Sequence, residues 1–133
     1  MDTLENIIGF DNYKINVLLT RNKEELECLG FLNENGFFIK PFDRNFKFIK
    51  IRFNEDSFYN DIFLTDCKIK NSNSILGFIN RIFVFFNNAK ILNSDLDNKF
   101  EVNFHLKNKD YDLGLNYRDN YIFEIRISMN ENR

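Results

Sequence analysis

Hydrophobic and polar residues alternate in several segments of the chain, and a period of two residues is typical of β-strands with one buried face. The alternation is most regular in the last third of the sequence, where three such segments are separated by polar turns at 108–109 and 118–120. This arrangement predicts a three-stranded antiparallel meander with one apolar face. The alternating apolar residues are Phe100, Val102, Phe104 and Leu106, then Tyr111, Leu113, Leu115 and Tyr117, then Tyr121, Phe123, Ile125 and Ile127.

Four earlier segments also carry strand-like patterns. Apolar residues occupy every second position from Tyr13 to Leu19, and strand-forming residues are dense in 37–42, 46–53 and 58–70. In the segment 46–53 both parities are apolar, which indicates a strand in the interior of the sheet that is covered on both faces for part of its length.

Two segments have helical spacing. Asn22 followed by Glu25 has the form of a capping box, so a helix is expected to begin there and to end near Asn35-Gly36. The segment 75–86 has an apolar stripe at helical intervals and follows serine residues that suit an N-cap. A buried strand over 82–86 is the alternative, but the length of the stripe favours a helix, which would cover the apolar face of the meander.

Together these patterns predict a single α+β domain over residues 1–133. The expected sheet is mixed or antiparallel, has about five to seven strands, and is accompanied by two helices. A chain of 133 residues is long enough to bury its own core without a metal or a disulfide.

Composition adds little that is specific to function. Phe, Ile, Asn and Lys make up about half of the residues, and all four have A/T-rich codons, so an A/T-rich genome accounts for their number. The net charge of −2 excludes attraction of duplex DNA or an anionic membrane by the overall charge of the molecule.

The sequence predicts that the protein is located in the cytoplasm of a bacterium. The acidic segment at residues 1–6 does not have the basic region followed by an apolar region that is typical of a secretory signal. The longest apolar stretch, 75–86, is too short to span a bilayer. Cys28 and Cys67 are isolated from each other and from histidine, so no metal site is expected, and two buried free thiols are favoured over a disulfide. No cofactor is expected.

The polar face of the meander is predicted to carry a row of charged side chains. The register expected for the first hairpin, with Leu106 opposite Tyr111, places His105 opposite Asp112, and that expected for the second places Asp112 opposite Arg126. A catalytic interpretation assigns His105 as acid or base, Asp112 as its orienting group and Arg126 as an anion-binding group. A ladder of exposed charge pairs is the favoured alternative, because no nucleophile is placed beside the row.

A second candidate site is the segment 40–53, which interleaves basic and aromatic residues. On a sheet face it could bind single-stranded nucleic acid through stacking and phosphate contacts. It lacks the glycines of the RNA-recognition signature, and such interleaving arises easily in a chain with 17 Phe residues. Nucleic acid is therefore not the expected partner.

Acidic residues are concentrated in the first half of the chain, where they outnumber basic residues, whereas the second half has a small basic excess. A concentrated acidic patch steers a protein onto a basic partner, although a solvated face is the alternative for any single cluster. The candidate partner-binding residues are Glu24, Glu25 and Glu27 on the early helix, and Glu55, Asp56, Asp61 and Asp66 around the middle strand.

The chain has no Gly-rich phosphate loop, no H-E-x-x-H and no G-x-S-x-G. In size, mild acidity, composition and an α+β plan that ends in the meander at 100–127, it resembles the small cytoplasmic immunity proteins of bacterial polymorphic-toxin and contact-dependent growth inhibition systems. The resemblance implies a one-to-one protein inhibitor, not an enzyme, that covers the active site of a cognate toxin, often a nuclease. The acidic residues would then imitate nucleic-acid phosphates.

Three alternatives stay open at this level. The first is a phage- or plasmid-encoded inhibitor of a host enzyme. The second is a small nuclease or hydrolase that uses His105, Asp112 and Arg126. The third is a single-strand binder that uses the segment 46–53.

Overall fold

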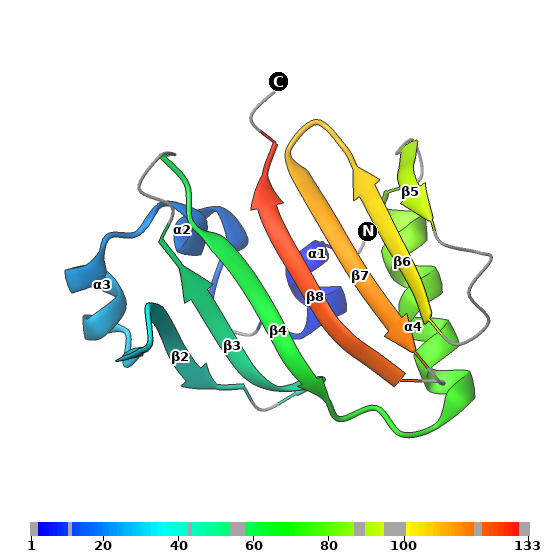
Figure 1. Cartoon of the computed structure of the whole chain (residues 1–133), viewed down its shortest axis with the longest axis horizontal. Helices are drawn as coiled ribbons and strands as arrows, with labels where there is room; N and C mark the ends of the chain where they lie inside the picture. The colour runs from blue at the N-terminus through cyan, green and yellow to red at the C-terminus, as the bar shows by residue number, and fades with distance from the viewer. Residues whose placement is uncertain are drawn as a thin grey trace.

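The strands form one antiparallel sheet in the order β1-β2-β3-β4-β8-β7-β6-β5 (Figure 1). The structure is a computed structural model that describes residues 3–10, 12–42, 44–53, 58–86, 90–94, 101–118 and 121–130. The strands are β1 (Leu32–Glu34), β2 (Phe37–Pro41), β3 (Phe46–Arg52), β4 (Asp61–Cys67), β5 (Lys90–Ser94), β6 (Glu101–Lys107), β7 (Tyr111–Arg118) and β8 (Tyr121–Met129). The helices are α1 (Leu4–Ile8), α2 (Ile15–Thr20), α3 (Lys23–Cys28) and α4 (Ser72–Phe85).

This architecture confirms the predicted α+β fold and its closing three-stranded meander, because β6, β7 and β8 are consecutive neighbours in the sheet. The strands expected at 37–42, 46–53 and 58–70 are present as β2, β3 and β4, and the segment 75–86 is helical in α4. Two short edge strands that the hydrophobic pattern did not predict, β1 and β5, bring the described sheet to eight strands.

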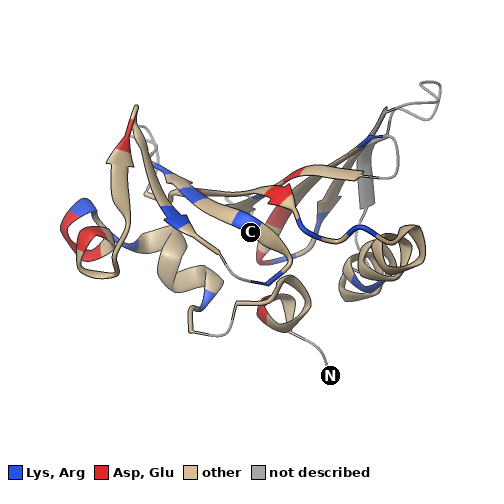
Figure 2. Ribbon diagram, turned by 90° about the horizontal axis from the view of Figure 1, so that it is seen from below, with Lys and Arg blue, Asp and Glu red and all other residues tan. Residues whose placement is uncertain are grey.

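All four described helices lie on one side of the sheet (Figure 2). We call the sheet face that they cover the inner face. It is aliphatic because alternate residues of each strand point to it, and α2 and α4 contact its central strands. β3 is an interior strand as predicted, but the described helices cover only one of its faces. The fully buried inner-face residues of the central strands include Ile49, Ile51, Ile62, Leu64, Ile125 and Ile127.

The segment from Tyr13 to Leu19 was predicted as a strand, and that prediction is wrong. It contains α2, whose buried residues are Ile15, Leu18 and Leu19. Their spacing of three and four residues is the helical pattern, and it competes with the alternation that predicts a strand. Burial of Leu18 against the sheet favours the helix, since a strand would point Leu18 away from its buried neighbours.

The expected end of the early helix near Asn35-Gly36 is also wrong. α3 ends at Cys28, and Asn35 and Gly36 form the turn between β1 and β2, where Glu34 pairs with Phe37. Both turn residues have positive φ, 54° and 86°, as a tight two-residue hairpin turn requires. The Asn-Gly pair therefore joins two strands rather than ending a helix.

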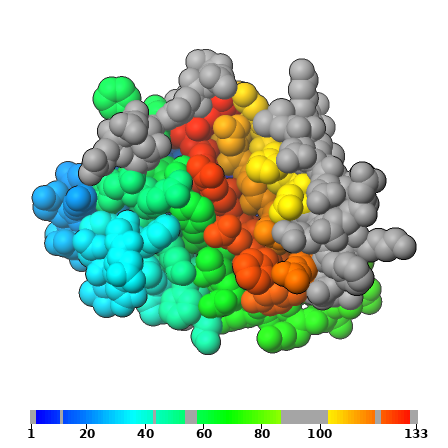
Figure 3. All heavy atoms as spheres, viewed as in Figure 1, coloured from blue at the N-terminus to red at the C-terminus, as the bar shows by residue number. Residues whose placement is uncertain are grey.

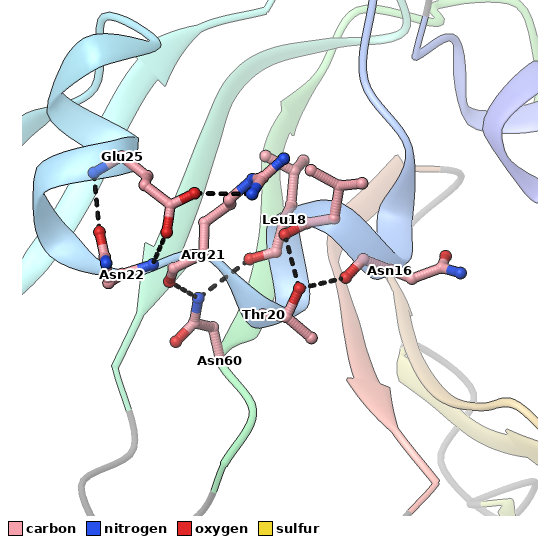
Figure 4. A network of polar contacts seen from close by, with 8 residues as sticks. Asn16, Leu18, Thr20, Arg21, Asn22, Glu25 and Asn60 are labelled. Carbon is pink, nitrogen blue, oxygen red and sulfur yellow. Dashed lines mark hydrogen bonds and ion pairs between the residues drawn. The ribbon is translucent and has the colours of Figure 1, made fainter.

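Side-chain capping connects α2, α3 and the start of β4 (Figure 4). The buried Asn60 donates from Nδ2 to the carbonyl oxygens of Leu18 and Arg21, both at 2.9 Å, and so caps the end of α2. The predicted capping box of Asn22 and Glu25 is confirmed, and Arg21 adds an ion pair to Glu25 at 2.6 Å. These contacts fix the two short helices against the sheet.

Candidate interaction face

No described helix covers the sheet face opposite the helices, which is the face seen in Figure 3, and the sheet curves so that this face is concave (Figure 2). We call it the open face. In β4, Ile62 and Leu64 point to the inner face, so Asp61, Phe63 and Thr65 point to the open face. The open-face residues of β3, β8, β7 and β6 are Phe48, Lys50, Arg52, Glu124, Arg126, Ser128, Asp112, Gly114, Asn116, Asn103, His105 and Lys107.

A buried carboxylate lies at the centre of the open face. Asp61 is 6% exposed, and its Oδ2 accepts hydrogen bonds from Nη2 of Arg52 at 2.8 Å and from Nη2 of Arg126 at 3.3 Å. Its Oδ1 accepts a hydrogen bond from the Ser128 hydroxyl at 3.0 Å. A carboxylate can be buried at low cost only when it is paired and hydrogen-bonded, and these three donors, from β3 and β8, meet that condition.

The two arginines of this cluster also stack against one aromatic ring. The guanidinium carbons of Arg52 and Arg126 lie 5.2 Å and 5.7 Å from the centroid of Phe63. Phe37 meets the same ring edge-on at 5.8 Å. The arginine side chains remain 44% and 50% exposed, so the stacking and the shared carboxylate hold two solvent-accessible guanidinium groups in place. We call Arg52, Asp61, Phe63, Arg126 and Ser128 the Asp61 cluster.

One cross-strand row of the open face contains basic side chains, an aromatic ring and a glycine. Lys50 pairs with Phe63, Phe63 with Arg126, Arg126 with Gly114, and Gly114 with His105, so the row crosses five strands. A Cβ atom on Gly114 would lie 3.9 Å from ring atoms of His105 and 4.0 Å from Cβ of Arg126. The missing side chain therefore leaves a gap between a histidine and an arginine.

This gap belongs to a cavity of about 240 Å³, which we call the Gly114 hollow. It brings together all three residues of the predicted charged row, although they come from three different strands. The hollow is lined by His105, Leu106, Asp112, Leu113, Gly114, Arg126 and Ser128.

The predicted pairing within the charged row is nevertheless wrong. His105 lies opposite Gly114 and not opposite Asp112, and Arg126 also lies opposite Gly114. Asp112 lies two residues before Gly114 in β7, between Lys107 and Ser128. A shift of two residues keeps every side chain on the expected face, so the alternation alone cannot distinguish the two registers.

The turn decides the register of the first hairpin. The Asn108 side-chain oxygen accepts hydrogen bonds from the backbone N–H groups of Asp110 and Tyr111, both at 2.8 Å. The Asn108 N–H donates to the Tyr111 carbonyl at 3.0 Å, which closes a loop of two residues. The sequence prediction placed a four-residue loop here, and the difference of two residues is the error in the row.

The second hairpin contains a β-bulge that the alternation did not predict. Arg118 pairs with Tyr121, and the register shifts between Asn116 and Tyr117. Phe123 is the additional residue on β8 and is 58% exposed, whereas Ile122 takes the buried position. Phe123 was predicted on the apolar face of the meander, and the bulge is the reason that this prediction is wrong.

The acidic residues predicted to bind a partner are not gathered in one place. Glu24 and Glu27 are exposed on α3, whereas Glu25 is used in the capping box, and Asp61 is buried in its cluster. Asp66 is exposed near the other end of β4, at a positive φ of 59°. Glu55 and Asp56 lie outside the described residues. The described members of the set therefore do not form a single acidic patch.

Sequence reasoning missed Phe63, Gly114 and Ser128 as members of a site, and it included Arg52 only within the basic and aromatic segment 40–53. A signal for Phe63 was available, because Phe63 and Asp61 share the polar parity of a strand whose other parity is aliphatic. Gly114 also stands alone in a regular alternation, where glycine weakens a strand and often marks a close approach of another group. What the sequence could not give is the register that brings them together.

The described residues contain no group of three or more His, Cys, Asp or Glu side chains that could hold a metal ion. Cys28 and Cys67 are free thiols, and Cys28 is exposed, contrary to the expectation that both are buried. Burial raises the pKa of the Cys67 thiol above its usual range. None of the helices in the ranges given above has the length and apolar character needed to span a bilayer.

Comparison of the chain with protein families, with curated proteins and with solved structures finds no match.

Proposed function

We propose that the protein is a cytoplasmic immunity protein that neutralises a cognate bacterial toxin by direct protein–protein contact through the open face. The observation that supports this function best is a concave sheet face, uncovered in the described part of the chain, whose centre presents two half-exposed arginine side chains ordered on one aromatic ring. Arginine and aromatic residues are enriched in protein interfaces and among the residues that dominate binding energy. An enzymatic activity is not part of the proposal.

The Asp61 cluster suits such a binding surface because it is already ordered. Arg52 and Arg126 share one carboxylate and one aromatic ring, so their side chains are held before a partner arrives. Long side chains usually lose rotamer freedom when they bind, and prior ordering lowers that cost. Glu24 and Glu27 on α3 stay candidates for a separate contact with a basic part of the toxin.

The test is neutralisation of a toxin encoded beside this gene. The toxic domain of the neighbouring gene is expressed in a bacterial host with and without this protein, and growth is measured. We expect growth to be restored by co-expression and a one-to-one complex to be recovered by size-exclusion chromatography with light scattering. A phage- or plasmid-encoded inhibitor of a host enzyme would use the same face, but it would leave the neighbouring toxin active.

Variants on the two sides of the sheet test the face. Lys50→Glu and Arg126→Glu reverse charges on the open face and are expected to abolish growth rescue. Val84→Glu adds the same charge at a 64% exposed position of α4, on the helix side, and is expected to rescue growth like the unmodified protein. Full rescue by both open-face variants, with circular dichroism confirming their folding, would exclude the open face.

A hydrolase is the second candidate, and the observation in its favour is that His105, Asp112 and Arg126 line one hollow. The Ser128 hydroxyl lines the same hollow but donates its hydrogen bond to Asp61 rather than to His105, so it is not arranged as a nucleophile with a histidine base. If purified protein hydrolyses an ester or phosphodiester substrate, His105→Ala must remove that activity. Survival of the activity in His105→Ala would eliminate this candidate.

A further inference from the structure

We infer that the Gly114 hollow is a seat for a carboxylate side chain, Asp or Glu, of the protein partner. This inference rests on the proposed function, since it assigns a chemistry to the partner that the open face binds. It differs from the expectation that acidic residues of this chain contact a basic toxin, because here the acidic group belongs to the partner.

The shape of the hollow suits a small group. His105 and Arg126 lie on β6 and β8, on either side of Gly114 on β7, so their backbones are about 10 Å apart across two strand spacings. Gly114 contributes no side chain to fill the space between them. A carboxylate that enters from the solvent could therefore approach the sheet backbone with a basic side chain on each side.

The charges along the row favour an anion. The row of Lys50, Phe63, Arg126, Gly114 and His105 contains no acidic residue. Arg126 contacts Asp61 through one nitrogen at 3.3 Å, which is longer than the 2.8 Å contact of Arg52, and its side chain is half exposed. A guanidinium has five N–H donors, so Arg126 can bind a second carboxylate while it remains beside Asp61.

Two further polar residues, Asp112 and Ser128, line the hollow. Asp112 lies opposite Lys107 in the register of β6 and β7, two residues from Gly114, and the Ser128 hydroxyl donates to Asp61. Within the row itself, the side chains on either side of Gly114 are those of His105 and Arg126.

A nucleic-acid phosphate fits the open face less well than a protein carboxylate. Binding of single strands relies on exposed aromatic rings on which bases stack. The Phe63 ring in the same row is only 9% exposed and is covered by Phe37 and by two guanidinium groups. The net charge of −2 also opposes long-range attraction of a polyanion.

The experiment uses acetate as the probe, so that it does not depend on the identity of the toxin. The intact protein is labelled with nitrogen-15 and titrated with sodium acetate at constant ionic strength, and the backbone amide shifts are followed by NMR. We expect saturable shifts at Gly114, His105 and Arg126. Gly114→Val, which fills the hollow, and Arg126→Gln, which removes the guanidinium, should each weaken acetate binding about tenfold or more.

Lys70→Gln is the matched control, because Lys70 is an exposed cation outside the sheet, and it should leave the acetate titration unchanged. The absence of saturable shifts at the hollow, or equal binding by folded Gly114→Val, would overturn the carboxylate seat even if the toxin is neutralised. Acetate binding without toxin neutralisation would instead contradict the proposed function alone. A short oligothymidine that displaces acetate from the same amides at lower concentration would overturn the assignment to a protein carboxylate.

Discussion

The two faces of the sheet are built from the same strands but are stabilised in different ways. In β4, Leu64 is fully buried under the helices, whereas its neighbour Phe63 lies on the open face between two arginines. Inner-face residues contribute apolar burial, which has no preferred direction and tolerates small shifts. Open-face residues contribute ion pairs and hydrogen bonds, which depend on register. We therefore expect mutations on the inner face to change stability and mutations on the open face to change mainly binding.

The largest difference between the faces should appear at adjacent residues of β4. Leu64→Ala removes a fully buried side chain and is expected to lower the free energy of unfolding by about 2–5 kcal/mol. Thr65→Val on the open face is the control. The Thr65 hydroxyl oxygen is buried and has no hydrogen-bond partner among the described residues, so replacing it by a methyl group should cost less than about 0.5 kcal/mol or stabilise the protein. Urea unfolding measures both, and equal losses would contradict the division between the faces.

The second largest effect is expected in the Asp61 cluster, a part of the open face that also contributes to stability. Asp61→Asn removes the charge that two arginines and one hydroxyl contact, and should cost about 1–3 kcal/mol in urea unfolding. In a double-mutant cycle with Arg52→Gln, the two losses of stability are expected to be less than additive, because either change alone removes the ion pair between Arg52 and Asp61. Additive effects of the two changes would show that the ion pair contributes nothing measurable.

Apart from Phe123 at the bulge, the face of the described meander residues could be predicted from the sequence, but the register could not. Alternation placed His105, Asp112 and Arg126 on one polar face, and the structure confirms that face. Their pairing was wrong by two residues, because parity is the same in both registers and the side chain of Asn108 closes a tighter turn. The site around Gly114 depends on that register, so it was not predictable from periodicity alone.

Short elements were predicted less well than long ones, for a related reason. The six residues of α2 also alternate, and only packing of Leu18 against the sheet selects the helix. Asn35-Gly36 suits both a helix end and a hairpin turn, and the pairing of β1 with β2 selects the turn. In both cases a tertiary contact chooses between two local structures that the residues permit equally.

A smaller effect, visible only at alkaline pH, should distinguish the two thiols. Burial on the inner side raises the pKa of Cys67 in the folded protein above the ordinary 9.0. The Cys67 thiol therefore ionises at a lower pH in the unfolded chain than in the folded protein. Its contribution to the free energy of unfolding is fully present below pH 9. Above pH 9 the free energy of unfolding falls by up to about 1.4 kcal/mol per pH unit, until the thiol of the folded protein ionises. Cys67→Ala should remove this part of the pH dependence.

Under native conditions near pH 8, Ellman's reagent should modify the exposed Cys28 rapidly and Cys67 only on unfolding. Rapid modification of both thiols would contradict the burial of Cys67.

The smallest effect concerns Gly114 and has the opposite sign. A Cβ atom at this position meets only ordinary van der Waals contacts, at 3.9 Å and beyond, so Gly114→Ala should raise the free energy of unfolding by about 0.5–1 kcal/mol through reduced entropy of the unfolded chain. Gly36→Ala is the matched control, because Gly36 has open space around it but a φ of 86°, and it should lower stability by about 1–2 kcal/mol. If Gly114→Ala raises the free energy of unfolding and weakens acetate binding, then Gly114 favours ligand binding while it lowers the stability of the sheet. A loss of stability at Gly114 would mean instead that the glycine is required by the fold, and the hollow would then be its by-product.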